Sequence, residues 1–166
     1  DVPEIAGQLA DRVELIRTVT GAERVHVVGH SLGGIVLRWY VQELGGDATV
    51  GTAITVASPH QGTYAAHAWF GRTARELQPG SWVVRRLAEG ARPSPVRWVA
   101  FYSNLDGLVL PAASAKLTDP ALHATNVLVK DTGHLAVLLA PGVAAAITDH
   151  LLGDAVREAG PAAEVA

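Results

Sequence analysis

Apolar positions recur with helical spacing at the start of the chain. The pattern predicts a helix that begins at Asp1, where Glu4 follows three residues later, and that ends near Gly21. One face of this helix carries Ile5, Leu9, Val13 and Ile16.

Short apolar runs then alternate with further helical segments. The runs that predict strands are residues 25–29, 50–56, 96–102 and 126–130. Helices are expected over residues 32–44, over residues 64–91 in two pieces separated by Pro79 and Gly80, and from Pro141 to about Leu152. This alternation predicts an α/β fold, with a parallel sheet of about four strands and helices on both faces. In such sheets, functional residues gather at the carboxyl ends of the strands.

Composition fits one well-buried domain, because 49% of the 166 residues are hydrophobic and only 17% are charged. The net charge of -3 gives no reason to expect nucleic acid as a partner. Cysteine is absent, which excludes disulfides and thiolate metal sites and leaves the compartment open. The longest apolar stretches, residues 48–71 and 135–148, are interrupted or too short, so no transmembrane segment is expected.

The strongest local signal is a G-x-S-x-G pentapeptide from Gly29 to Gly33, placed between a predicted strand and a predicted helix. Side chains at positions 29 and 33 are expected to collide with that strand and helix, so glycine suits both. The turn would lift the Ser31 hydroxyl out of the sheet, with helix amides behind the charge that develops during attack. The alternatives are a plain tight turn or a phosphate-binding loop, but no Gly-Lys-Ser/Thr follows. Ser31 is therefore predicted to be a nucleophile.

A serine hydroxyl needs a base that takes its proton, and three histidines follow any plausible acid. His134 lies just after the last strand, at its carboxyl end, whereas His123 precedes that strand and His150 lies within the final helix. We therefore expect His134 to be the base. Structural roles are expected for His30 and His60.

The base must be held in one tautomer by an acid, and in this type of fold the order along the chain is serine, acid, histidine. Asp106 fits that order, and it lies after the third strand, again at a carboxyl end. The alternative for Asp106 is a turn residue, since Asp-Gly pairs are common in turns. Asp131 is a rival acid, but a residue so close to His134 in the chain seldom reaches the far side of the imidazole. Asp106 is the predicted acid.

Five segments together resemble the α/β-hydrolase lipases and esterases, particularly the bacterial lipase-like group. They follow the family order over nearly the whole chain: residues 20–34, 58–63, 77–81, 106–109 and 133–135. The resemblance implies the C-terminal portion of the α/β-hydrolase fold. It agrees with Asp106 as the acid, and it favours an extracellular protein.

We interpret residues 1–153 as part of the catalytic domain and residues 154–166 as a flexible tail. The resemblance makes residues 64–92 a candidate lid or cap. The aromatic and apolar side chains of that segment fit a lid, a wall of the acyl pocket or ordinary core: Trp69, Phe70, Trp82 and Val83.

The oxyanion formed during attack needs two backbone donors. The amide of Leu32 is the expected first donor, and the second comes from a loop after an earlier strand, which this chain does not contain. The resemblance implies about four strands before the one over residues 25–29, so we expect an upstream part of roughly 100 residues to be absent, and the lack of methionine agrees with this. Turnover is then expected to fall by about 100 to 1,000 fold. An unpaired edge of the strand over residues 25–29 is expected to favour self-association.

The sequence thus predicts a serine carboxyl-ester hydrolase, a lipase or esterase, that acts on lipid-like esters through an acyl-enzyme on Ser31. No metal or cofactor is expected. The same three residues also fit an acyltransferase or a thioesterase, because acceptor choice depends on the pocket. A third alternative is an inactive fragment that retains the fold.

Overall fold

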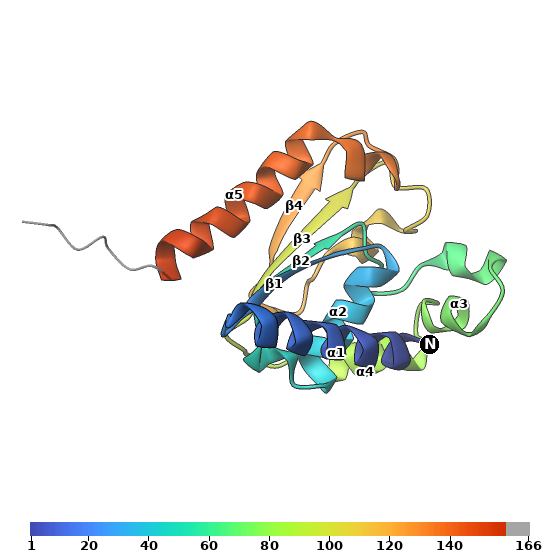
Figure 1. The fold of residues 1–166 in the computed structure, drawn as a ribbon. Helices are drawn as coiled ribbons and strands as arrows, with labels where there is room; N and C mark the ends of the chain where they lie inside the picture. The colour runs from blue at the N-terminus through green and yellow to red at the C-terminus, as the bar shows by residue number, and fades with distance from the viewer. Residues whose placement is uncertain (159–166) are drawn as a thin grey trace, which may run out of the picture.

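A computed structural model of the protein describes residues 1–158 and contains one parallel four-stranded sheet, in the order β1-β2-β3-β4 (Figure 1). The strands are β1 Val25–His30, β2 Val50–Val56, β3 Arg97–Ser103 and β4 Thr125–Val129. All three strand pairs are parallel, as the alternating pattern predicted. The predicted strands are found at these places, with β3 and β4 each shifted by one residue.

Helices cover both faces of the sheet, with α1, α2 and α4 on one side and α5 on the other (Figure 1). The α-helices are α1 Val2–Thr20, α2 Leu32–Glu43, α3 Arg72–Glu76, α4 Trp82–Glu89 and α5 Pro141–Glu158. Short 3-10 helices lie between them: η1 Gly46–Ala48, η2 Tyr64–Ala68, η3 Ala112–Ala115, η4 Pro120–Leu122 and η5 Ala136–Leu139.

Both ends of α1 form as the sequence predicted. The Asp1 carboxylate accepts the backbone N–H of Glu4 at 3.0 Å, which satisfies one of the donors that a helix leaves free at its start. At the other end Gly21 has φ 73°, and its N–H donates to the carbonyl of Arg17. A left-handed residue after the last turn is easiest for glycine, so the helix ends there.

The sheet separates two apolar clusters. On the α1 and α2 side, Trp98 packs with Ile35 and Leu37, whereas Phe101 packs on the α5 side with Val137. Trp98 and Phe101 are three residues apart on β3, and an odd spacing puts two side chains on opposite faces of a strand. β3 is therefore buried on both faces, as the strands of parallel sheets usually are.

The register aligns the carboxyl ends of all four strands. His30 of β1 pairs with Val56 of β2, and Val56 pairs with Phe101 of β3. Ser103 at the end of β3 pairs with Val129 at the end of β4. The loops that follow the four strands therefore meet at one edge of the sheet, which is where ligands bind in this class of fold.

Two helical predictions need correction. Residues 64–78 were expected to form one helical piece, but they form η2 and α3 instead, and Gly71 between the two has φ 104°. The last helix runs to Glu158, six residues beyond the expected end at Leu152. Residues 159–166 of the predicted tail lie outside the described residues.

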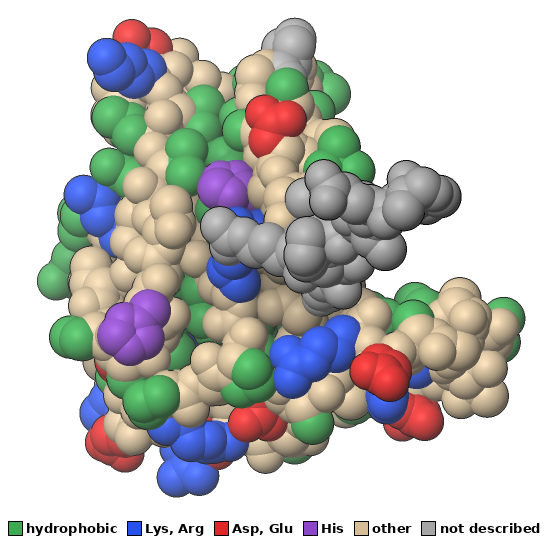
Figure 2. Space-filling model, turned by 90° about the vertical axis from the view of Figure 1, so that its left-hand side faces the viewer, with side chains coloured by type: hydrophobic (Ala, Val, Ile, Leu, Met, Phe, Trp, Pro, Cys, Tyr) green, Lys and Arg blue, Asp and Glu red, His purple; other side chains and the backbone are tan. Residues whose placement is uncertain are grey.

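Charged side chains of both signs are distributed over the surface. On the face in Figure 2, Lys and Arg groups alternate with Asp and Glu groups, and the described residues form no extended patch of one sign there. Within residues 1–158, no helix is both long enough and apolar enough to cross a membrane.

Candidate active site

Ser31 lies on a sharp turn between β1 and α2, with φ 51° and ψ -120°. A residue other than glycine rarely adopts this conformation, and such strain is concentrated at functional sites. The backbone N–H of Ser31 donates to the carbonyl of Val56 at 2.9 Å, which fixes the turn to β2. The Ser31 side chain makes no capping hydrogen bond to α2, so its hydroxyl is left for another partner.

Two glycines allow the backbone to pack closely at this turn. One is Gly29, as the motif suggested, and the other is Gly34 in place of Gly33. A methyl group on Gly29 would lie 2.6 Å from the backbone of Gly33, as expected. A methyl group on Gly33, however, would meet no atom of the described residues within 4 Å, so the predicted collision there is wrong. Gly34 is the second tight position, since its methyl group would lie 2.7 Å from the Ser58 side chain.

The structure brings Ser31, His134 and Asp106 together in one chain of hydrogen bonds. The Nε2 atom of His134 lies 2.9 Å from the Ser31 Oγ, and its Nδ1 atom lies 2.8 Å from the Asp106 Oδ2. His134 and Asp106 are 8% and 4% exposed, so water competes little for either bond. These residues come from the loops after β1, β3 and β4, more than 70 positions apart in the case of Ser31 and Asp106.

Backbone amides hold the Asp106 carboxylate in place. Its Oδ1 atom accepts the N–H groups of Leu108 and Val109 at 2.8 and 2.9 Å. Bonds of this kind fix the plane of the carboxylate. The Thr63 hydroxyl ties the same loop to the one after β2, because it donates to the carbonyl of Leu108 and accepts the N–H of Leu110.

The rival residues lie elsewhere. The Asp131 carboxylate accepts the Asn104 amide at 2.9 Å and is not the partner of His134. His123 precedes β4, at the opposite end of the sheet from Ser31. His150 lies in α5 and contacts Arg97 and the Phe101 ring.

Leu32 is the first residue of α2, next to Ser31. The first N–H groups of a helix have no acceptor within the helix, and they carry the positive end of its dipole. In the described part of the chain β1 is the first strand, so a loop after an earlier strand is not among these residues.

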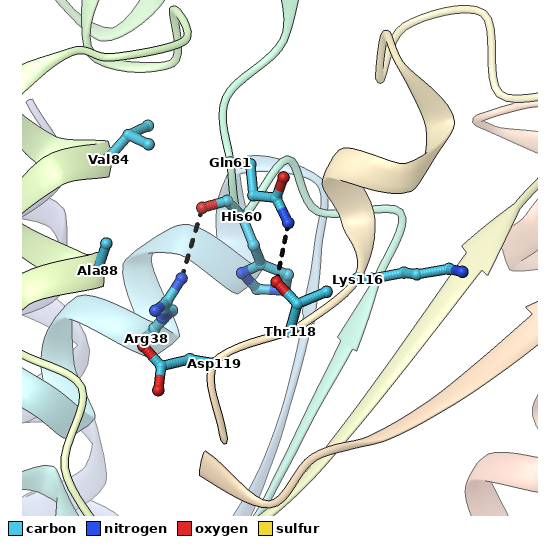
Figure 3. Close-up of a pocket in the computed structure, with 8 residues that line it drawn as sticks. All are labelled: Arg38, His60, Gln61, Val84, Ala88, Lys116, Thr118 and Asp119. Atoms are coloured by element: carbon cyan, nitrogen blue, oxygen red, sulfur yellow. Dashed lines mark hydrogen bonds between the residues drawn. The ribbon is translucent and has the colours of Figure 1, made fainter. Parts of the chain in front are cut away.

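His60 is buried and lines a cavity of about 160 Å³ (Figure 3). Its Nε2 atom lies 2.9 Å from the Thr55 hydroxyl, and burial, together with the charge of Arg38, holds the pKa of His60 well below its usual value. The guanidinium of Arg38 donates to Gln42 and to the carbonyls of His60 and Leu87. Burial lowers the pKa of Arg38 to about 10, although the nearby Asp119 acts in the opposite direction. These contacts tie α2 to α4 and to the loop after β2.

Large apolar side chains are exposed in the loops that follow β2, β3 and β4. Phe70 is fully exposed and Leu139 is 85% exposed. We call the set the apolar rim, and it comprises Tyr64, Trp69, Phe70, Leu105, Leu108, Leu110, Leu135, Leu138 and Leu139. Within the candidate lid the side chains differ, because Val83 is fully buried and Trp82 packs edge-on against Trp39.

Among residues 1–158, no group of three or more His, Asp or Glu side chains is arranged to hold a metal ion. The one carboxylate of the site, that of Asp106, is engaged with backbone amides and with the imidazole of His134.

A parallel sheet flanked by helices, with a serine on the turn after β1, defines the α/β-hydrolase fold. Solved structures agree. A Listeria innocua protein, the lin2722 gene product, has a TM-score of 0.69 at 17% identity, with 91% of this chain and 66% of that protein covered. Aspergillus fumigatus lipase B has a TM-score of 0.70 at 20% identity, with 83% of this chain and 38% of the lipase covered. Bacillus licheniformis lipase BlEst2 in mature form has a TM-score of 0.67 at 20% identity, with 82% of this chain and 69% of that lipase covered.

The family follows from the sequence. A model of the palmitoyl protein thioesterase family matches residues 2–105, more than half of the chain, and the protein belongs to that family. The matched range contains Ser31 but neither Asp106 nor His134. The chain spans 38% to 69% of the three structures above, and no curated protein sequence matches it significantly.

Proposed function

We propose that the protein is a serine hydrolase that cleaves acyl esters or thioesters, with Ser31 as nucleophile, His134 as base and Asp106 as the residue that orients the base. The hydrogen-bond chain from Asp106 through His134 to Ser31 is the observation that carries this proposal. An imidazole bonded on one side to a hydroxyl and on the other to a buried carboxylate is the arrangement that activates a serine.

In the first half of the reaction the Ser31 Oγ attacks the carbonyl carbon of the substrate while His134 Nε2 takes the hydroxyl proton. The carbonyl oxygen becomes an oxyanion, and we assign the amide of Leu32, the first residue of α2, as a donor to it. When the tetrahedral intermediate collapses, the bond to the alcohol or thiol breaks and His134 returns its proton to the leaving group. The acyl group is now an ester of Ser31.

In the second half water attacks the Ser31 ester, and His134 Nε2 takes a proton from that water. Collapse of the second intermediate breaks the bond to Ser31 Oγ, releases the carboxylic acid and returns the proton to the serine. Asp106 accepts the Nδ1–H of His134 throughout, so Nε2 always faces the reacting atoms. No cofactor is required in either half.

The apolar rim supports an acyl group of lipid type. Large exposed apolar surfaces next to a site mark binding to apolar ligands or partners. The rim lies in the loops after β2, β3 and β4, and the last two of these loops carry Asp106 and His134, so we infer that the rim contacts an alkyl chain on the acyl carbon.

Membership of the palmitoyl protein thioesterase family favours thioesters as a second class of substrate besides oxygen esters. A thiolate leaves more easily than an alkoxide, so the same three residues would serve both bonds. Matched oxygen esters and thioesters with one acyl chain would decide between them through the ratio of their kcat/KM values.

Hydrolysis of p-nitrophenyl esters by the wild type and by Ser31→Ala tests the proposal. We expect the wild type to release nitrophenol faster from octanoate than from acetate, and Ser31→Ala to lose at least about 1,000 fold in kcat/KM. Acid quenching of the wild-type reaction should trap an acyl group on Ser31, detected by peptide mass. Retention of the activity by Ser31→Ala would contradict the proposal.

A further inference from the structure

His30 joins the strand that carries the nucleophile to the loop that carries the base. Its Nε2 atom lies 3.1 Å from the backbone carbonyl of His134, although the two residues are 104 positions apart. The two rings also touch, with centroids 4.8 Å apart and an interplanar angle of 46°.

The loop that holds His134 is fixed at its start from β3. The side chain of Asn104 and the backbone and carboxylate of Asp131 exchange two hydrogen bonds, and the Ser103 hydroxyl donates to the carbonyl of Thr132. These contacts hold residues 131–132. The bond from His30 holds the loop two residues later, at His134 itself.

The position of His30 makes this contact geometrically direct. His30 is the last residue of β1, it pairs with Val56, and Ser31 follows it immediately. A displacement of the His134 backbone relative to β1 would therefore change the Ser31–His134 distance at once. The bond from His30 therefore restrains the distance between Ser31 and His134.

The chemistry of the contact separates His30 from the base. A carbonyl only accepts hydrogen bonds, so Nε2 of His30 must carry the proton in this bond. Burial lowers the pKa of His30, with the nearby His134 acting in the same direction, although its bond to the His134 carbonyl and the charge of Asp106 oppose the shift. A neutral Nε2–H tautomer meets the requirement of the bond without adding charge beside His134.

We propose that His30 is a positioning residue that anchors the backbone of His134 so that the imidazole stays within bonding distance of Ser31. This role rests on the proposed function of the same site. The hydrogen bond of His30 goes to the backbone of His134 and not to the Ser31 hydroxyl or the Asp106 carboxylate, so His30 acts through His134.

Two substitutions of equal chemistry and different reach test the role. The amide nitrogen of His30→Gln reaches about as far as imidazole Nε2, whereas that of His30→Asn is shorter by one bond and reaches only to the place of Nδ1. We expect His30→Gln to keep the labelling rate of Ser31 by a fluorophosphonate within about threefold. His30→Asn and His30→Ala should lose on the order of 100 fold, because a misplacement of about 1 Å costs that much.

His123→Asn serves as the control histidine. His123 is exposed, precedes β4 and has φ 46°, a conformation that asparagine tolerates well. We expect this variant to react like the wild type. In steady-state kinetics His30→Asn and His30→Ala should lower kcat with little change in KM, because binding of the acyl group is not altered.

A second readout separates this role from the proposed function. NMR follows the exchange of the His134 Nδ1 proton, which the Asp106 carboxylate protects in the wild type; exchange should accelerate in His30→Ala and His30→Asn but not in His30→Gln. Equal exchange and equal labelling in all four proteins would overturn the role of His30. Absence of labelling in the folded wild type would overturn the proposed function, and the exchange data would still decide on His30.

Discussion

Asp106 differs from other acidic side chains of the protein because it is buried and bonded on both oxygens. One oxygen accepts two backbone amides, and the other faces His134 Nδ1. A carboxylate so fixed selects the imidazole tautomer that leaves Nε2 free to accept the Ser31 proton. Asp131, the nearest competitor along the chain, is exposed and bonded to Asn104.

Asp106→Asn is predicted to lower kcat for ester hydrolysis by on the order of 10,000 fold, because an amide favours the wrong tautomer of His134. Asp131→Asn is the matched control and should stay within a few fold. Circular dichroism and stopped-assay kinetics on the two purified variants measure the difference. Equal activity of the two variants would remove Asp106 from the site.

The three side chains that the sequence proposed for the site lie within hydrogen-bonding distance of one another, because each follows a strand and parallel strands end at one edge. The sequence did not predict the contact of His30 with His134, since no local pattern reports a bond between residues 104 positions apart. The collision expected at Gly33 was wrong for a related reason. The close neighbours of α2 come from β2 and its loop, and they face Gly34.

The turn between β1 and α2 depends on close backbone packing at Gly29. Gly29→Ala would place a methyl group 2.6 Å from the carbonyl of Gly33 and 2.7 Å from the amide of Gly34, and neither backbone group is free to move without shifting α2. We predict a loss of about 1 to 3 kcal/mol in the free energy of unfolding, the usual cost of overpacking.

Gly33→Ala is the control for this turn. It meets open space among the described residues, and alanine suits a helix better than glycine by about 0.5 to 1 kcal/mol. Urea denaturation of both variants measures the effect. A Gly29→Ala protein as stable as the wild type would contradict the close packing.

Helices and strands with a clear local signal in the sequence were predicted well. Elements that depend on tertiary contacts were not. The caps of α1 and the β-branched runs of β1 and β2 are local signals. The segment of residues 64–78 has apolar spacing compatible with a helix, yet Thr63 caps a short 3-10 helix and Gly71, with φ 104°, interrupts the segment. The Thr63 hydroxyl is bonded to the loop after β3, a contact that the sequence does not reveal.

β1 is an edge of the described sheet, and Val28 on it is 47% exposed. We propose that this edge drives self-association, as the sequence suggested. Val28→Lys should shift sedimentation-velocity profiles towards monomer at high protein concentration, because a lysine on an edge strand opposes pairing. A wild type that sediments only as monomer under the same conditions would contradict the proposal.

For the whole molecule, two histidines with lowered pKa values link folding to pH. The pKa of His60 is well below its usual value of 6.5, mainly because burial disfavours the charged ring, and that of His30 is lowered by burial as well. Below pH 6.5 the unfolded chain therefore binds more protons than the folded protein. Stability from these residues is complete above pH 6.5 and is lost as the pH falls.

We predict that the free energy of unfolding decreases below pH 6.5, by up to about 1.4 kcal/mol per pH unit for each such histidine. His60→Gln retains a partner for Thr55 but does not titrate. The free energy of unfolding of this variant should therefore depend less on pH than that of the wild type, by the contribution of one histidine. Urea denaturation at pH 7.5, 6.0 and 5.0 compares the two proteins. Identical slopes would show that His60 is not buried in its neutral form.

The protein as a whole combines a family match that contains Ser31 with a geometry that adds His134 and Asp106 from outside the matched range. Fluorophosphonate labelling read by peptide mass spectrometry tests that combination most directly. We predict one adduct per molecule on Ser31, absent in Ser31→Ala and slowed by orders of magnitude in His134→Ala. A folded wild type that stays unmodified, or one modified at another serine, would contradict the assignment of Ser31 as an activated nucleophile.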